Sequence, residues 1–300
     1  MIGEQKTSLL GHTLGSNPDL YCRILASHDY LNKNVLSCSV IGHQLQAANI
    51  LLSLSVYDEL KKSNYNQIIE KYDSFVFHNG EKYLLFINNK SSTYWNALYS
   101  LLKTKTSNDV KIAETLLTTI QTSKIQTDIL FDEEKSTASH GSFVLLALID
   151  AYRATKDNKF LIGACYCAEV LMNQIIDYDP YLCLGLSILY DFTNDIKYFN
   201  RKKSIISSVL KLKTKSMTSL IAGLAQQMLT FTDEEKRRNE IFLRQIECQI
   251  YKKTENSGAF IIRPEKNEIR LDYIYENLLG MVQFLTREKY IYCDKILDIE

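Results

Sequence analysis

Apolar residues recur along most of the chain at the three- and four-residue spacing of helices that bury one face. The clearest case is the apolar stretch 145–154, which is followed by a polar turn that begins at Thr155. Phe160 then opens a second helical stretch that runs to about Asn173. Thr or Ser followed by Asn or Asp is typical of a helix stop and an N-cap, because these short side chains accept from the first N–H groups of the next helix. The pattern therefore predicts a unit of helix, tight turn and helix.

This unit repeats along the chain. The same order of residues returns at 184–198 and around 231–236, and residues 60–65 and 101–109 have the composition of two more such turns. Counting a last pair around residues 272–298, the chain holds about six helical hairpins. One hairpin cannot bury both of its apolar faces, so the units must stack as an open α-solenoid or a closed ring. The turn threonines are 38 and then 39 residues apart: Thr155, Thr193 and Thr232.

Three segments break the helical pattern and predict short strands. Residues 75–87 form two apolar runs around an Asn-Gly pair, residues 127–131 predict a strand, and residues 259–271 predict a second hairpin. Each segment is followed by a loop and a helix start, and a closed ring needs such connectors at its rim, whereas an open solenoid does not. We therefore predict an all-α fold, an (α/α)6 toroid of six helical hairpins with a few short β-hairpins at the rim. The predicted domain spans 1–300, with 1–17 as a candidate flexible segment.

Composition narrows the function classes. Hydrophobic residues make up 46% of the chain and charged residues 23%, and 35 Lys and Arg balance 35 Asp and Glu. A net charge of zero provides no general attraction to phosphate, so we expect no nucleic-acid partner. With only 3 Pro and 11 Gly, the chain lacks the turn residues of a many-stranded β-sandwich.

The cysteines and the apolar runs indicate the compartment. Seven cysteines without a CxxC pair predict free thiols, and five scattered histidines give no zinc pattern, so we expect no metal and no cofactor. The N-terminus lacks the order of a signal peptide, and the longest apolar run, 143–149, is too short to span a membrane. We therefore expect a cytoplasmic protein, and its oligomeric state stays open.

Two stretches resemble a known group of enzymes. Residues 148–160 (Leu-Ile-Asp-Ala-Tyr-Arg-Ala-Thr-Lys-Asp-Asn-Lys-Phe) resemble the helix–turn–helix junction of (α/α)6-toroid carbohydrate enzymes. These include glucuronyl hydrolases, N-acylglucosamine 2-epimerases and the C-terminal domain of D-glucuronyl C5-epimerases. Gly258-Ala259-Phe260, followed by Arg270-Leu271-Asp272-Tyr273, is similar to the Gly-x-Phe and Arg-x-Asp-Tyr stretch of the C5-epimerases, whose His-Thr-Thr-His continuation is replaced at 274–277. The resemblance implies a toroid that acts on an acidic or N-acyl sugar.

The helix start after the second predicted hairpin holds several candidate catalytic residues. Asp272 and Glu276 are four residues apart, hence on one helix face, where two carboxylates could act as acid and base or nucleophile on a glycosidic bond. In the alternative, Asp272 only caps the helix and Glu276 is solvated. Arg270 would either hold a substrate carboxylate or neutralise Asp272. Tyr273 is a candidate proton donor or base.

Two other helix starts hold further candidates. His140 opens a helix, where the positive helix end favours a neutral imidazole base, and Asp128 on the preceding strand could orient it. Tyr94 and Trp95 could stack on a sugar ring. The alternatives are a loop histidine, a solvated acid and core aromatics. His43 lies in an apolar stretch and is interpreted as a core histidine.

The leading hypothesis is a carbohydrate-active enzyme, a hydrolase, epimerase or lyase, that acts on a small-molecule or oligosaccharide substrate in a central cup. The alternative is a non-catalytic α-solenoid or toroid that binds a protein or peptide partner. An enzyme requires the candidate residues to converge in one concave pocket, whereas a scaffold predicts scattered positions along a groove.

Overall fold

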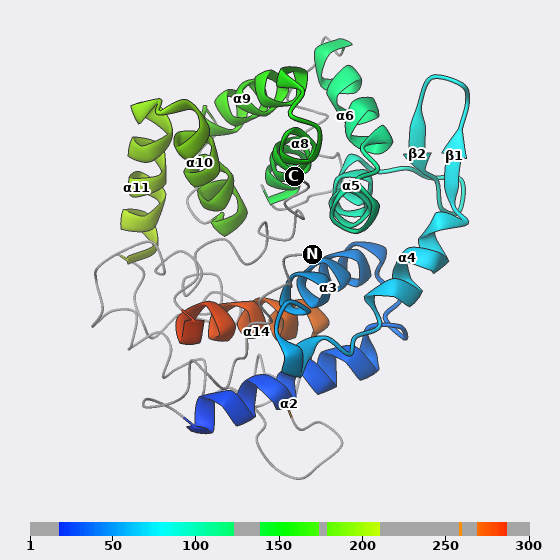
Figure 1. Ribbon diagram of the computed structural model, residues 1–300, viewed down its shortest axis with the longest axis vertical. Helices are drawn as coiled ribbons and strands as arrows, with labels where there is room; N and C mark the ends of the chain where they lie inside the picture. Colours follow the sequence, from blue (N-terminus) through cyan, green and yellow to red (C-terminus); the bar gives the residue numbers. More distant parts are fainter. Residues whose placement is uncertain (1–17, 123–138, 174–178, 211–257, 260–268, 287–300) are drawn as a thin grey trace, which may run out of the picture. The chain divides into compact units, whose positions relative to one another are not determined.

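A computed structural model describes residues 18–122, 139–173, 179–210, 258–259 and 269–286 (Figure 1). These residues are mostly helical, so the all-α prediction is confirmed at that level. They divide into two compact units, one within 1–66 and 210–294 and the other within 67–209. Closure of six hairpins into one ring stays a prediction.

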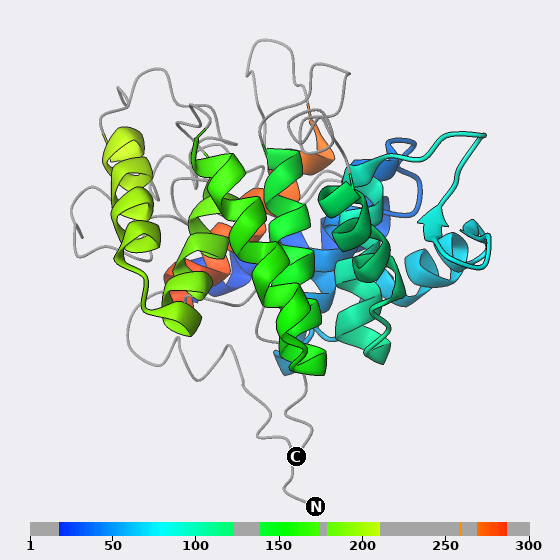
Figure 2. The ribbon, with the colours of Figure 1, turned by 90° about the horizontal axis from the view of Figure 1, so that it is seen from above.

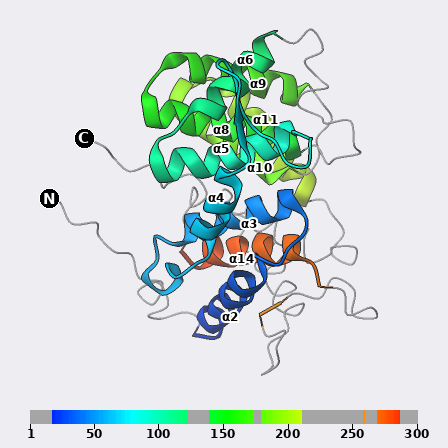
Figure 3. The same ribbon diagram turned by 90° about the vertical axis from the view of Figure 1, so that its right-hand side faces the viewer.

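The first unit is built on two buried helices and one amphipathic helix. Its elements are α2 (Pro18–Asn34), α3 (Ile41–Leu54), the 3-10 turn η1 (Asp58–Leu60) and α14 (Leu271–Thr286). Helix α14 packs against both α2 and α3 and lies between them (Figures 1 and 3). Residues 44–54 of α3 and 274–282 of α14 are buried throughout, as expected of helices that are covered on every side.

The segment at Gly258 lies directly against the backbone of α2. The Ser27 hydroxyl donates to the carbonyl of Gly258 over 2.8 Å. Gly258 has a φ of +95°, and a Cβ atom at this position would lie 2.0 Å from the carbonyl oxygen of Ala26. Only glycine combines this backbone conformation with this close approach. The glycine of the Gly-Ala-Phe motif therefore has a packing role.

The second unit consists of a β-hairpin and successive helix pairs. Its elements are most of α4 (Tyr65–Asp73), β1 (Val76–His78), β2 (Tyr83–Leu85), α5 (Thr93–Ser107), α6 (Lys111–Thr122), α8 (Ser139–Thr155), α9 (Asn158–Met172), α10 (Pro180–Thr193) and α11 (Ile196–Leu210).

Core helices alternate with surface helices in this unit. Residues 141–151 of α8 and 181–189 of α10 are all buried, and α5 is buried over 96–105 apart from Lys103. Helices α6, α9 and α11 each bury one face and expose the other. Helix α8 packs against α5, α9 and α10 (Figure 2). The pairs α5–α6, α8–α9 and α10–α11 are therefore the predicted hairpins, each a core helix followed by a surface helix.

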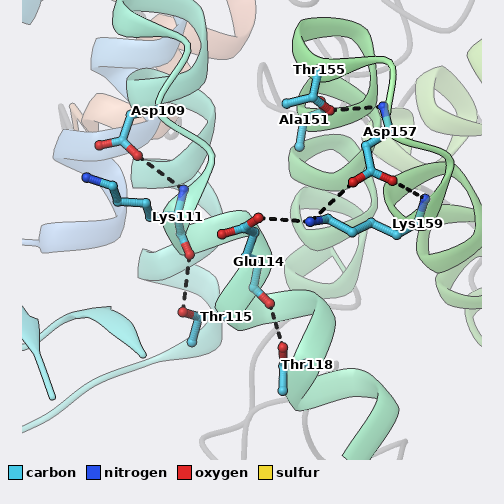
Figure 4. Close-up of polar contacts among 9 residues, drawn as sticks. All are labelled: Asp109, Lys111, Glu114, Thr115, Thr118, Ala151, Thr155, Asp157 and Lys159. Carbon is cyan, nitrogen blue, oxygen red and sulfur yellow. Dashed lines mark hydrogen bonds and ion pairs between the residues drawn. The ribbon is translucent and has the colours of Figure 1, made fainter. Parts of the chain in front are cut away.

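The turns of the α8–α9 and α10–α11 pairs share one hydrogen-bond pattern, and Figure 4 shows the first of these turns. The Thr155 hydroxyl donates to the carbonyl of Ala151 over 2.8 Å and accepts from the Asp157 N–H over 3.2 Å. The Asp157 carboxylate then accepts from the Lys159 N–H at the start of α9. Thr193, Asp195 and Lys197 repeat these bonds between α10 and α11.

This pattern confirms two predicted helix ends and leaves a third untested. Helix α8 ends at Thr155 and α10 ends at Thr193, as the spacing of the threonines predicts. Thr232 lies outside the described residues. The connection around 60–65 is longer than a tight turn, because residues 55–64 and η1 separate α3 from α4.

The hairpin predicted at 75–87 is confirmed. Strands β1 and β2 pair antiparallel, with Val76 opposite Leu85 and His78 opposite Tyr83. The loop spans 79–82, and the Asn79 side chain accepts from the Lys82 N–H over 2.9 Å. The strand predicted at 127–131 and most of the hairpin predicted at 259–271 lie outside the described residues. The described cysteines are free thiols, as predicted, and Cys248 and Cys293 are not among them.

Candidate functional site

The start of α14 holds a bidentate ion pair. Arg270 precedes the helix, and its Nε donates to Asp272 Oδ1 over 3.0 Å while its Nη2 bonds Oδ2. A side-by-side pair of this kind is a strong, oriented interaction, and a carboxylate in the first helical turn also gains from the helix dipole. The Arg270 side chain is 48% exposed and that of Asp272 is 10% exposed. The structure therefore shows Arg270 paired with Asp272, and its predicted binding of a substrate carboxylate stays a prediction.

Glu276 lies one turn further along α14 and is buried. The residue is only 5% exposed, so the alternative that it is solvated is wrong. Ile274, Leu278 and Val282 of the same helix are also buried. Helix α14 is therefore covered both along these apolar residues and on the side of Asp272 and Glu276.

His43 joins this group from the start of α3. Its ring lies 6.3 Å from the ring of Tyr275, centre to centre. Burial lowers the pKa of His43, whereas the charge of Asp272 raises it and that of Arg270 lowers it. His43 is therefore within electrostatic reach of both members of the ion pair. We call His43, Arg270, Asp272 and Glu276 the His43 cluster.

The neighbouring residue fixes the start of α3. The Gln44 side-chain amide donates to the carbonyl of Val35 over 2.7 Å and to that of Leu36 over 3.1 Å. These bonds tie the first turn of α3 to the end of α2, and so they hold His43 in place. The interpretation of His43 as a core histidine missed this cluster. The sequence feature that could have indicated this cluster is the Gly-His pair at the start of a helix. A His-Gly pair stands at the helix start of His140, which was taken as a candidate.

In the second unit, the starts of the core helices share a row of aromatic rings. Tyr94 and Trp95 are half-buried in the first turn of α5. The Tyr94 ring lies 5.6 Å from that of Phe143 on α8, which lies 4.4 Å from that of Tyr181 on α10. The structure thus brings the aromatic candidates beside the helix that His140 opens.

A buried carboxylate that the sequence analysis missed joins two of these helix starts. Asp179 caps α10 by accepting from the N–H groups of Tyr181 and Leu182. It also accepts from the hydroxyl of Ser142 on α8 over 2.7 Å. Burial raises the pKa of Asp179, and its hydrogen bonds act in the opposite direction. The sequence feature that could have revealed Asp179 is its position directly before Pro180, because proline is common as the first residue of a helix and the residue before it is then the N-cap.

The other candidates are placed by their helices or lie outside the described residues. His140 is in the first turn of α8 and Tyr273 in the first turn of α14. Asp128 is not among the described residues. The predicted convergence of the candidate residues in one pocket stays a prediction; these residues are Tyr94, Trp95, His140, Arg270, Asp272, Tyr273 and Glu276. Across the described residues, no three His, Cys, Asp or Glu side chains are grouped so that they could hold a metal ion.

No protein-family model, curated protein or solved structure matches the chain. The resemblance to toroid carbohydrate enzymes therefore rests on the sequence motifs alone. In the part of the chain that the structure describes, no helix has the length and apolar character needed to cross a membrane.

Proposed function

We propose that the chain is a carbohydrate-active enzyme of the (α/α)6-toroid class that transfers a proton on an acidic sugar at the His43 cluster. One observation carries this proposal: the His43 ring lies 6.3 Å from that of Tyr275, so the start of α3 is beside the turn of α14 that holds the bidentate Arg270–Asp272 pair, although the two helix starts are far apart in sequence. A base near a cation and a carboxylate is a suitable arrangement for acid–base catalysis, and buried Glu276 follows one turn along α14.

The alternation of core and surface helices supports the toroid. Three successive pairs in the second unit follow this order, and α3 and α14 in the first unit are also core helices. In a toroid, the starts of the inner helices point into the central cup. In the first unit, His43 and Asp272 lie in first turns of core helices, which is where a toroid enzyme would hold its catalytic groups.

In the proposed reaction, His43 transfers the proton and Arg270 stabilises the charge that develops on the substrate. A neutral His43 imidazole would take the proton from the carbon beside the sugar carboxylate, so that the C–H bond breaks and an N–H bond forms. The electron pair would move into the carboxylate, where the guanidinium of Arg270 would stabilise the added negative charge. Return of a proton from the other face would give an epimer, and expulsion of a leaving group from the adjacent carbon would give a lyase product.

This arrangement favours epimerase or lyase chemistry over hydrolysis. Asp272 is bound to Arg270 through both carboxylate oxygens, so it is not placed as a nucleophile. Its role would be to hold Arg270 in position. Buried Glu276 would then be the second proton-transferring group.

A deuterium-exchange assay tests this proposal. The wild-type protein would be incubated in D2O with a panel of uronic acids, their oligomers and N-acyl sugars, and exchange at ring carbons followed by proton NMR. We expect exchange with an acidic sugar, and His43→Gln should slow it roughly 10²- to 10⁴-fold because the general base is lost. Asp272→Asn should also slow exchange, since Arg270 would lose its anchor.

A matched control separates the site from the fold. His78→Gln changes a histidine on the β-hairpin, outside the His43 cluster, and should leave exchange unchanged. Thermal unfolding of each variant would show that the fold is intact. Equal exchange in wild type and a folded His43→Gln variant would contradict the role of His43. Absence of both binding and exchange across the panel would favour the scaffold hypothesis.

A further inference from the structure

A second polar site lies in the second unit, outside the His43 cluster and the aromatic row. A cavity of about 180 Å³ opens where α4, the β-hairpin, α5 and the start of α6 meet. Its polar lining consists of Asp73, Tyr83, Tyr99, Lys103, Asp109 and Lys111. Two carboxylates, two ammonium groups and two phenols therefore face one small space.

One wall of the cavity is a preformed network. The Tyr99 hydroxyl bonds the Asp73 carboxylate, and the Lys103 ammonium lies 3.2 Å from the same carboxylate. Burial and the neighbouring Asp73 raise the pKa of Tyr99, so its phenol stays protonated. Asp73 is thus held from two sides, with its side chain still 44% exposed.

The opposite wall is formed by the turn between α5 and α6. Asp109 accepts from the Lys111 N–H over 3.1 Å, which orients the carboxylate at the helix start. The Lys111 ammonium lies 5.2 Å from the centre of the Tyr83 ring. Figure 4 shows Lys111 and Glu114 directed to opposite sides of the start of α6.

Lys111 differs from the lysines at the same place in the two later turns. Lys159 bonds Glu114 over 2.9 Å, and Lys197 bonds Glu169 over 2.7 Å, each on the preceding surface helix. Within the described part of the chain, the Lys111 ammonium forms no ion pair, and it lines the cavity instead. The turn between α5 and α6 thus places a lysine at the cavity without the glutamate partner that Lys159 and Lys197 have in the later turns.

We propose that this cavity binds a small zwitterion of the α-amino acid type. The ligand carboxylate would bind Lys111, and its ammonium group would bind the carboxylates of Asp109 and Asp73. Charge complementarity supports this class, because an anion alone would meet two carboxylates and a cation alone would meet two ammonium groups. The size also fits, since a cavity of about 150 Å³ holds benzene, which has as many heavy atoms as alanine.

Titration of the full chain with four small probes tests the proposal. L-Alanine carries both a carboxylate and an ammonium group. L-Lactate carries only the carboxylate, ethylamine only the ammonium group, and glycerol neither. Calorimetry should show the tightest binding for L-alanine. Lys111→Met keeps the alkyl stem and should weaken that binding roughly tenfold to a hundredfold, the effect expected for loss of a charged hydrogen bond.

The later turn supplies matched controls. Lys159→Met and Asp157→Asn make the same changes between α8 and α9 and should leave L-alanine binding unchanged. Asp109→Asn keeps the helix cap and should weaken binding through loss of charge. Lack of L-alanine binding, equal binding of lactate, or equal effects of Lys111→Met and Lys159→Met would overturn the proposal. None of these outcomes bears on the His43 cluster, whose test uses sugars and other variants.

Discussion

Replacing Lys105 with Met should lower the free energy of unfolding by about 3–5 kcal/mol, the usual cost of breaking a buried ion pair from one side. Lys105 Nζ lies 3.9 Å from Asp150 Oδ2, and both side chains are fully buried. Arg153 Nη1 lies 4.0 Å from Oδ1 of the same carboxylate and is partly exposed. The substitution would leave the buried carboxylate with less compensating charge. Urea unfolding followed by circular dichroism would measure the loss.

A double variant shows whether charge or volume causes this loss. Lys105→Met combined with Asp150→Leu removes both buried charges and keeps apolar bulk between α5 and α8. Replacing a complete buried pair by apolar residues is often neutral or stabilising. We therefore expect the double variant to regain most of the stability lost by the single one. A single variant as stable as wild type would contradict the stabilising role given to Lys105.

Gly258→Ala should destabilise the protein by about 3 kcal/mol, the sum of backbone strain at positive φ and overpacking. The new Cβ would lie 2.0 Å from the Ala26 carbonyl oxygen, and backbone atoms cannot move aside as a side chain can. Segment 258–259 would have to leave α2 and lose the bond from Ser27. The shift in urea midpoint against wild type measures this effect.

Gly163→Ala provides the comparison. Its Cβ would come too close only to the end of the Leu117 side chain, which can change rotamer, and would make an ordinary contact with Leu148. Alanine also favours the helix over glycine by roughly 1 kcal/mol, which offsets part of the crowding. Gly258→Ala should therefore be clearly the more harmful of the two. Equal losses of stability in the two variants would contradict the packing role given to Gly258.

The fold was predictable where its cause is local. The bonds of Thr155 and Asp157 join residues two to four positions apart, and so the spacing of the turn threonines located the ends of α8 and α10. The Asn-Gly hairpin is equally local. Burial of α14 on the side of Glu276 depends on α2 and α3, which the periodicity of one helix does not reveal.

The candidate site was predictable only in part for the same reason. Arg270 and Asp272 are neighbours in sequence, and one of the two predicted roles of Arg270 is observed. His43 reaches them through the packing of α3 against α14, which joins residues more than two hundred positions apart. Lys111 was missed because it matches Lys159 in sequence, and only the cavity distinguishes them.

The most direct test of the proposed site is the titration of His43 by proton NMR, with its C2 resonance assigned from the His43→Gln variant. In the wild type, the pKa should lie below the usual value of about 6.5 because burial disfavours the charged ring. Asp272→Asn should lower the pKa further, since it removes a negative charge, and Arg270→Gln should raise it. Opposite shifts in the two variants would establish that the starts of α3 and α14 form one coupled site. An identical His43 titration in wild type and both variants would contradict it.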